Sequence, residues 1–138
     1  MVVETGLDES VLSTQHGSVW EGGLMDAFFD AGFIVTNSPV TRIESRPAVD
    51  LSGIILNDFE DAEIGGAEFF ILAYLDCQDQ GGRMLPLNMT LKMYSINSRQ
   101  LVFEQSFPVS MERTLEQEFE VAKNAGRILI NYIRTNRV

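Results

Sequence analysis

His16 and Cys77 are the side chains of this sequence whose types most often carry nucleophilic or acid–base catalysis, and each occurs once. A cysteine nucleophile needs a nearby base or cation that lowers its thiol pKa. The acidic neighbours of Cys77 in the sequence, Asp76 and Asp79, act in the opposite direction. His16 stands beside Gly17, and no nucleophile or orienting partner is visible around it. We therefore predict no catalytic residue, and we interpret His16 as a surface histidine and Cys77 as a buried structural thiol.

A carboxylate cluster at residues 58–63 is the densest set of candidate metal ligands. Hard cations such as Ca²⁺ need several oxygens that converge from a tight loop with a defined spacing. Here the carboxylates are distributed around one helical turn, where the helix dipole alone favours acidic residues. We therefore predict no metal site, and we interpret the acidic run at 116–120 as a solvated helix face. The residues concerned are Asp58, Glu60, Asp61 and Glu63, and then Glu116, Glu118 and Glu120.

The glycines and the overall charge exclude further classes of function. Gly-Gly pairs begin at Gly22, Gly65 and Gly81, but none has the lysine and hydroxyl residues of a phosphate-binding loop or the spacing of a dinucleotide-binding turn. We therefore predict no cofactor. Twenty acidic against ten basic residues give a net charge of −10, which disfavours nucleic acid as a partner because phosphate binding depends on Lys and Arg. No apolar run is long enough to predict a membrane span.

Apolar spacing predicts the elements that position these side chains. The spacing from Trp20 to Phe28 places one face of a helix toward a core. Ser13 or Thr14 is expected to cap this helix, and Gly32 is expected to end it in a left-handed conformation. A second helix is predicted to begin at residues 57–58 and to stop at the glycine pair 65–66. The final helix is predicted to follow a cap at Ser110, with an apolar stripe from Leu115 to Ile133.

Strands are predicted at 2–4, 33–37, 69–75, 85–94 and 101–107, with a short strand or turn at 52–56 and loops at 41–50 and 78–82. In the segment 85–94, apolar residues alternate with polar ones, which predicts that the odd-numbered side chains point to the core. The order is β-α-β-α-β-β-β-α. We predict a single α+β domain over residues 1–138, with a short strand and loop at 1–13 and a compact core at 14–135. A single-layer mixed sheet of four or five strands carries the first and last helices on one face.

The outward face of the 85–94 strand is the predicted partner-binding surface. Tyrosine and arginine are typical anchors of protein interfaces. A sheet face that is half exposed, or covered by a helix, is the alternative interpretation of the same pattern. The predicted partner-binding residues are Asn88, Thr90, Lys92 and Tyr94 on the strand and Arg99 at the hairpin tip.

Several short phrases over roughly residues 14–135 resemble a family of bacterial envelope proteins. The family includes the lipoprotein activator of penicillin-binding proteins, the amino-terminal domain of the TolB translocation protein and the curli-secretion lipoprotein. A helix that ends in Ala31-Gly32 and leads to an apolar segment is one shared phrase, and Gly66-Ala67 before 68–71 is another. The hairpin at 91–95 and 101–103 is similar to the family's hairpin. A long final helix closes the unit in both.

The resemblance implies a non-catalytic periplasmic or lipoprotein domain that binds another envelope protein. Met1 to Ser10 do not read as a signal peptide, so the chain either starts here or follows an export signal and lipid anchor in its precursor. A cytoplasmic location is the alternative to the periplasm or the outer membrane. A small-molecule-binding or enzymatic domain that uses Cys77 and His16 is the alternative function, and a homodimer is a further alternative.

Overall fold

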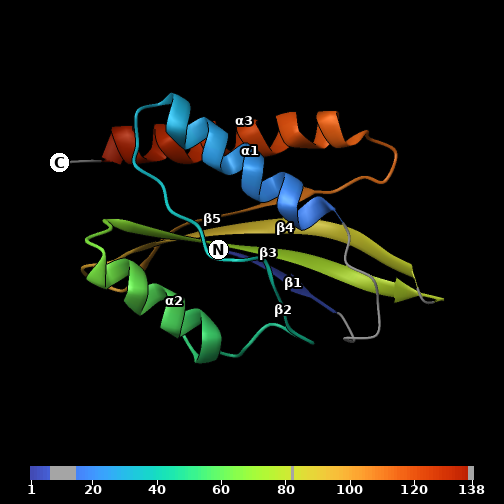
Figure 1. Ribbon diagram of the computed structural model, residues 1–138, viewed down its shortest axis with the longest axis horizontal. Helices are drawn as coiled ribbons and strands as arrows, with labels where there is room; N and C mark the ends of the chain where they lie inside the picture. Colours follow the sequence, from blue (N-terminus) through green and yellow to red (C-terminus); the bar gives the residue numbers. More distant parts are fainter. Residues whose placement is uncertain (7–14, 82, 137–138) are drawn as a thin grey trace.

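A mixed sheet runs through the middle of the molecule. The computed structural model describes residues 1–6, 15–81 and 83–136 (Figure 1). The strands of the described residues are β1 (Val2–Thr5), β2 (Thr41–Arg42), β3 (Phe69–Gln80), β4 (Arg83–Ser95) and β5 (Leu101–Pro108). Their order in the sheet is β2-β1-β3-β4-β5. β1 runs parallel to β2 and β3, whereas β3, β4 and β5 form an antiparallel meander.

Helices cover both faces of this sheet. In the described part of the chain they are α1 (His16–Asp30), α2 (Gly53–Ile64) and α3 (Leu115–Asn136). α1 and α3 lie together on one face, and α2 lies on the opposite face (Figure 1). The predicted α+β class, mixed sheet, order of elements and packing of the first and last helices are confirmed. None of the described helices is long and apolar enough to cross a membrane.

The prediction of a strand at 33–37 is wrong. Phe33 and Val35 are partly buried against the core that α1 and α3 share with the sheet, whereas Ile34 is fully exposed. The alternation that predicts a strand therefore reflects one-sided packing of an extended connection, and this connection forms no sheet pairing. The strand that follows α1 is β2, which lies in the segment predicted to be a loop and pairs with β1.

α2 begins earlier than the sequence predicts. Residues 52–56, predicted to be a short strand or turn, form the N-cap and first turn of α2, so the predicted cap at 57–58 lies inside the helix. Ile55 and Phe59, which are four residues apart, are both buried against the α2 face of the sheet. The helix therefore includes Ile55, which lies one turn before Phe59 on the buried side of α2. The predicted glycine stop is confirmed, because Gly66 has a left-handed φ of +82°.

The alternation predicted for 85–94 holds only in its second half, because Leu87 is half exposed. A β-bulge causes this exposure: the pairing of β3 with β4 shifts between Asp76 and Cys77, and Leu87 becomes the extra residue. β3 also extends to Gln80, into the polar loop predicted at 78–82, and β4 begins directly after that loop at Arg83. The inward side chains beyond the bulge are fully buried, and they are Met89, Leu91 and Met93.

α3 begins at Leu115, later than the predicted cap at Ser110. Thr114 caps it, because Thr114 Oγ1 accepts a hydrogen bond from the Gln117 N–H at 3.1 Å. Gln117 Oε1 in turn accepts one from the Thr114 N–H at 2.9 Å, which completes a capping box. The Ser110 hydroxyl accepts its hydrogen bond from the Glu112 N–H, inside the preceding turn.

α1 buries the face that its sequence predicts. Trp20 and Phe28 are both buried in the core between the helices and the sheet. Gly32 follows the helix with a φ of +86°, which confirms the predicted stop. The predicted caps, Ser13 and Thr14, lie outside the described residues.

α1 and α3 run side by side and approach each other closely (Figure 1). A Cβ added at Gly23 of α1 would lie 2.6 Å from the Ala122 Cβ of α3. A Cβ added at Gly126 of α3 would lie 2.7 Å from the Ala27 Cβ of α1. Because atoms cannot approach so closely without a shift, the helix pair has room only for glycine at these two positions.

We expect Gly23→Ala and Gly126→Ala each to lower the free energy of unfolding by about 1–3 kcal/mol, because the added methyl forces the helices apart. Gly22→Ala is the matched control, since its Cβ would meet Phe119 at 3.5 Å, an ordinary contact distance. Alanine's helix propensity should leave this control unchanged or stabilise it by up to about 1 kcal/mol. Urea unfolding of the three variants measures the difference, and equal effects at Gly22 and Gly23 would contradict the close contact.

Candidate functional site

Side chains from β3, β4 and the loop at 43–52 converge on the α2 face of the sheet. Asp50 of the loop accepts hydrogen bonds from the Tyr74 hydroxyl at 2.8 Å, from Lys92 Nζ at 2.8 Å and from the Tyr94 hydroxyl. Alternation along each strand places these donors on the same face. We call Asp50, Tyr74, Lys92 and Tyr94 the Asp50 cluster.

A second group is centred on Arg46 of the same loop. Arg46 Nε donates to Asp76 Oδ1 at 3.1 Å, and Nη2 donates to Asp76 Oδ2 and to Thr90 Oγ1, the latter at 2.8 Å. Thr5 of β1 donates to Asp76 Oδ1 at 2.7 Å. The Arg46 guanidinium also lies 4.7 Å from the centre of the Tyr74 ring, which joins this group to the Asp50 cluster. The loop is thus attached to β1, β3 and β4 by one continuous polar network.

The charges of the network stabilise one another. Burial by itself raises the pKa of Asp50, but hydrogen bonds from Lys92, Tyr94 and Tyr74 outweigh burial and lower that pKa. Burial, followed by the hydrogen bond to Asp50, raises the pKa of both tyrosines. Asp50 is therefore a carboxylate at neutral pH, and both phenols keep their protons. The network fits an anchor for the loop better than an acid–base centre, because its charged groups are committed to one another.

We expect Asp50→Asn to lower the free energy of unfolding by about 1–3 kcal/mol at neutral pH, because three donors lose their charged acceptor. The pKa of Asp50 in the folded protein lies below the ordinary value of 3.8. Its stabilising contribution is therefore complete above that pH and is lost as the pH falls through the folded pKa. Urea unfolding at a series of pH values should show the two proteins converging below about pH 4.

Glu63→Gln is the control for this comparison. It removes an exposed ion pair with Arg99, whose N···O distance is 3.2 Å, and exposed pairs contribute less than about 1 kcal/mol. An Asp50→Asn effect that is equally large in acid and at neutral pH would show that the carboxylate charge is not what holds the loop.

The structure places four of the five predicted partner-binding residues on one face of β4. Asn88 donates to Asp76 at 3.3 Å, and Thr90 and Lys92 take part in the network described above. Thr90 and Tyr94 are only 2% and 8% exposed, so the alternative interpretation of a covered face describes these two. Binding of a partner by these residues stays a prediction.

Arg99, the fifth predicted residue, lies apart from the network. It is exposed at the turn between β4 and β5, it pairs with Glu63 of α2, and its guanidinium lies 5.4 Å from the centre of the Phe59 ring. Sequence reasoning missed Arg46 and Asp50, which lie in a segment without periodicity. The available signal in the sequence was that Arg46 and Asp50, two residues of opposite charge, lie in one segment.

Cys77 and His16 lie in different electrostatic surroundings. Cys77 is buried, as predicted, and burial together with the charges of Glu4 and Asp76 raises the pKa of its thiol to about 12. The prediction of a surface position for His16 is wrong, because its side chain at the start of α1 is only 8% exposed. Burial lowers the pKa of His16, and the charges that act on it are those of Glu118 and Arg113.

Native Cys77 should therefore react slowly with iodoacetamide at pH 8, because almost none of it is thiolate. The labelling rate should rise with pH without an inflection below about pH 10, whereas the urea-unfolded chain should show one near the ordinary thiol pKa of about 8.5. Mass spectrometry of labelled protein measures both rates. Fast native labelling with an inflection near neutral pH would reveal an activated thiol.

Two buried glutamates were not predicted. Glu118, expected on a solvated face, accepts hydrogen bonds from Trp20 Nε1 at 3.1 Å and from Arg113 Nε at 2.7 Å. Its position on α3 faces α1, so these donors replace water. Glu4 of β1 is also buried, with Arg42 at 3.7 Å, and neither of its oxygens accepts a hydrogen bond within the described part of the chain. Burial raises the pKa of Glu4, and Arg42 partly offsets this.

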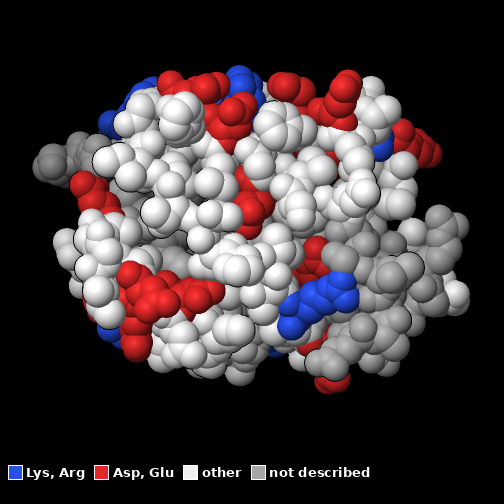
Figure 2. Space-filling view, viewed as in Figure 1, with Lys and Arg blue, Asp and Glu red and all other residues white. Residues whose placement is uncertain are grey.

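Carboxylates gather on the surface over α2 (Figure 2). Glu60, Asp61 and Glu63 are exposed there. They lie in the C-terminal half of α2 and not in its first turn, so the interpretation that the helix dipole favours them is wrong. Among the described residues, no three His, Cys, Asp or Glu side chains lie together so that they could hold a metal ion.

Comparison with known proteins gives distant structural neighbours. No family model and no curated protein matches the sequence. Among solved structures, the chain is similar to a PelC dodecamer from Paraburkholderia phytofirmans, with 13% identity and a TM-score of 0.44 over 93% of this chain and 83% of that chain. It is also similar to lipoprotein GNA1162 from Neisseria meningitidis, with 8% identity and a TM-score of 0.40 over 94% and 97% of the two chains.

TolB from Acinetobacter baumannii is a further neighbour, and TolB is also named by the sequence resemblance. Its identity is 9% and its TM-score 0.38, over 98% of this chain and 28% of that chain. At these identities and TM-scores, a function for this protein has to be drawn from its own residues.

Proposed function

We propose that this protein is a non-catalytic protein–protein interaction module of the bacterial cell envelope. The compartment is inferred from the sequence resemblance over residues 14–135. The interaction role is inferred from one observation, the anchoring of the loop at 43–52 to three strands by the polar network. A loop held in a single conformation loses little entropy when a partner binds it.

The anchored loop carries the kind of surface that a partner protein recognises. Val49 at its end is 64% exposed, and Ile54 in the first turn of α2 is 51% exposed. The Arg46 side chain is 32% exposed beside the carboxylate that it binds. Exposed apolar side chains and a partly exposed arginine, carried by one anchored segment, are the residue types found in interface cores. We call Arg46, Val49 and Ile54 the loop surface.

The surroundings of the candidate nucleophile and base support a non-catalytic role. A thiol whose pKa is raised to about 12 stays protonated at neutral pH and is a poor nucleophile. Burial and the charges of Glu4 and Asp76 keep the Cys77 thiol protonated, and this favours a structural role for it. The alternative function is an enzymatic or small-molecule-binding domain built on Cys77 and His16, and it is less favoured because it would need a reactive thiolate.

A photo-crosslinking amino acid at position 49 tests the proposal. The full-length protein is illuminated with envelope extract or cytosolic extract of the source organism, and crosslinked products are identified by mass spectrometry. We expect position 49 to capture one envelope protein, and Ile54→Asp should reduce this capture. The same crosslinking amino acid at position 128, which lies on α3, is the control and should not capture that protein. Capture of only cytosolic proteins, of a second copy of this chain, or of the same proteins from both positions would overturn the proposal.

A further inference from the structure

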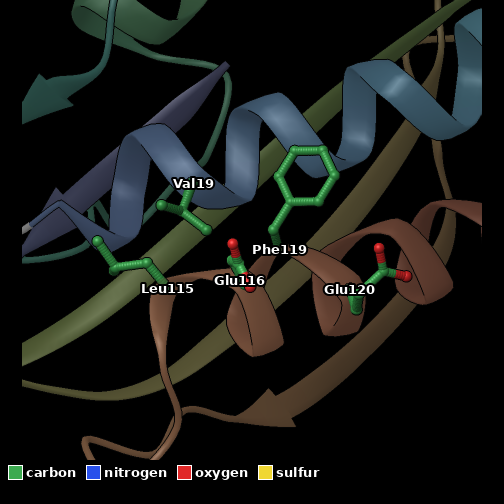
Figure 3. Close-up of a pocket in the computed structure, with 5 residues that line it drawn as sticks. All are labelled: Val19, Leu115, Glu116, Phe119 and Glu120. Atoms are coloured by element: carbon green, nitrogen blue, oxygen red, sulfur yellow. The ribbon is translucent and has the colours of Figure 1, made fainter.

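A shallow hollow lies on the opposite side of the molecule, between the first turns of α1 and α3. Val19 of α1 and Leu115 and Phe119 of α3 line it with apolar side chains, and Glu116 and Glu120 complete the lining (Figure 3). The Phe119 ring reaches from α3 toward α1 (Figure 3) and would lie 3.5 Å from a Cβ placed at Gly22. The absence of a side chain at Gly22 therefore leaves the ring uncovered on that side.

The apolar lining is accessible although it belongs to the two most closely packed helices. Leu115 is 42% exposed, and Val19 and Phe119 are half-buried. Thr114 caps α3 immediately before Leu115, so the capping box holds the Leu115 backbone in place. The hollow is thus presented on a rigid support, as the loop surface is on the other face.

The charge around the hollow has one sign. Glu116 and Glu120 are both exposed, and they also line a neighbouring depression along α3. Arg113, the cation at that depression, donates to Glu118 at 2.7 Å and to the Pro108 carbonyl at 2.7 Å, so its charge is already committed. An acidic border around an apolar floor complements a segment that carries Lys or Arg beside an apolar side chain.

We propose that this hollow is a second interaction surface, which binds a basic amphipathic segment of a partner protein. The segment inserts one or two apolar side chains against Val19, Leu115 and Phe119, while its Lys or Arg side chains pair with Glu116 and Glu120. The net charge of −10 favours the same class of partner by steering basic segments toward the protein. A second copy of this chain fits less well, because it would bring the same carboxylates into the interface.

Three synthetic peptides serve as probes of this surface. The first is an amphipathic helix of Leu and Lys with Leu at helical spacing, the second replaces Lys with Glu, and the third shuffles the first so that its Leu residues share no face. We expect the first peptide to shift the NMR signals of Val19, Leu115 and Phe119, and to bind at least about tenfold more tightly than the other two.

Matched variants identify the contacts. Leu115→Ser should weaken binding of the first peptide about tenfold, whereas Ile128→Ser, a similarly exposed position on α3, should not. Glu116→Gln with Glu120→Gln should weaken binding about three- to tenfold at low salt and little at high salt. The same charge change on α2, Glu60→Gln with Glu63→Gln, should have no effect. Circular dichroism and urea unfolding confirm that each variant is folded.

Several results would overturn the inference. They are equal binding of the Lys and Glu peptides, tight binding to Leu115→Ser, or signal shifts confined to α2. Self-association of the wild-type protein that Leu115→Ser abolishes, measured by light scattering, would identify a second copy as the occupant instead. Because the crosslinking at Val49 uses the opposite face, failure here leaves the proposed function standing, and failure there leaves this surface standing.

Discussion

The close contact between α1 and α3 is the constraint on which the rest of the structure depends. Gly23 and Gly126 leave no room for a methyl group, so the two helices form one layer over the sheet. That layer covers the buried methionine and leucine side chains of β4. It also brings Trp20 against Glu118, so a glutamate is held in the interior by an indole and by Arg113. The first turns of both helices are placed side by side as a result, and the hollow lies there.

The α2 face is organised by a different kind of interaction. α2 covers only part of the sheet with Ile55 and Phe59, and the polar network occupies the area beyond them. A charged group under a loop is costly unless it is paired, and here each cation has a carboxylate partner. The network therefore replaces apolar packing as the means of holding the loop. The two faces of one sheet thus support two surfaces of different chemistry.

Sequence reasoning succeeded where a pattern is local and failed where a contact partner is distant. The helix face from Trp20 to Phe28 and the stop at Gly32 follow from spacing and from backbone preference, so both are predictable. The connection after Gly32 has strand-like alternation, but its apolar side chains are buried by packing against the core and not by sheet formation. The bulge at Leu87 has no signal in its own strand, since it arises from the register with β3. Arg46 and Asp50 lie in a loop, and their roles follow from the side chains of β3 and β4 that they contact.

By itself, the sequence determined the order of elements, the mixed sheet and the helices that share a face, because hydrophobic periodicity and glycine positions act within each segment. It also determined the acidic net charge. Only the tertiary structure decided that Glu118 and His16 are buried, that Asp50 anchors a loop and that Val19 meets Leu115 and Phe119. These features depend on contacts between residues that are far apart in the chain. The free energy of a buried charge or an exposed apolar side chain is set by such neighbours, and a local sequence pattern does not identify them.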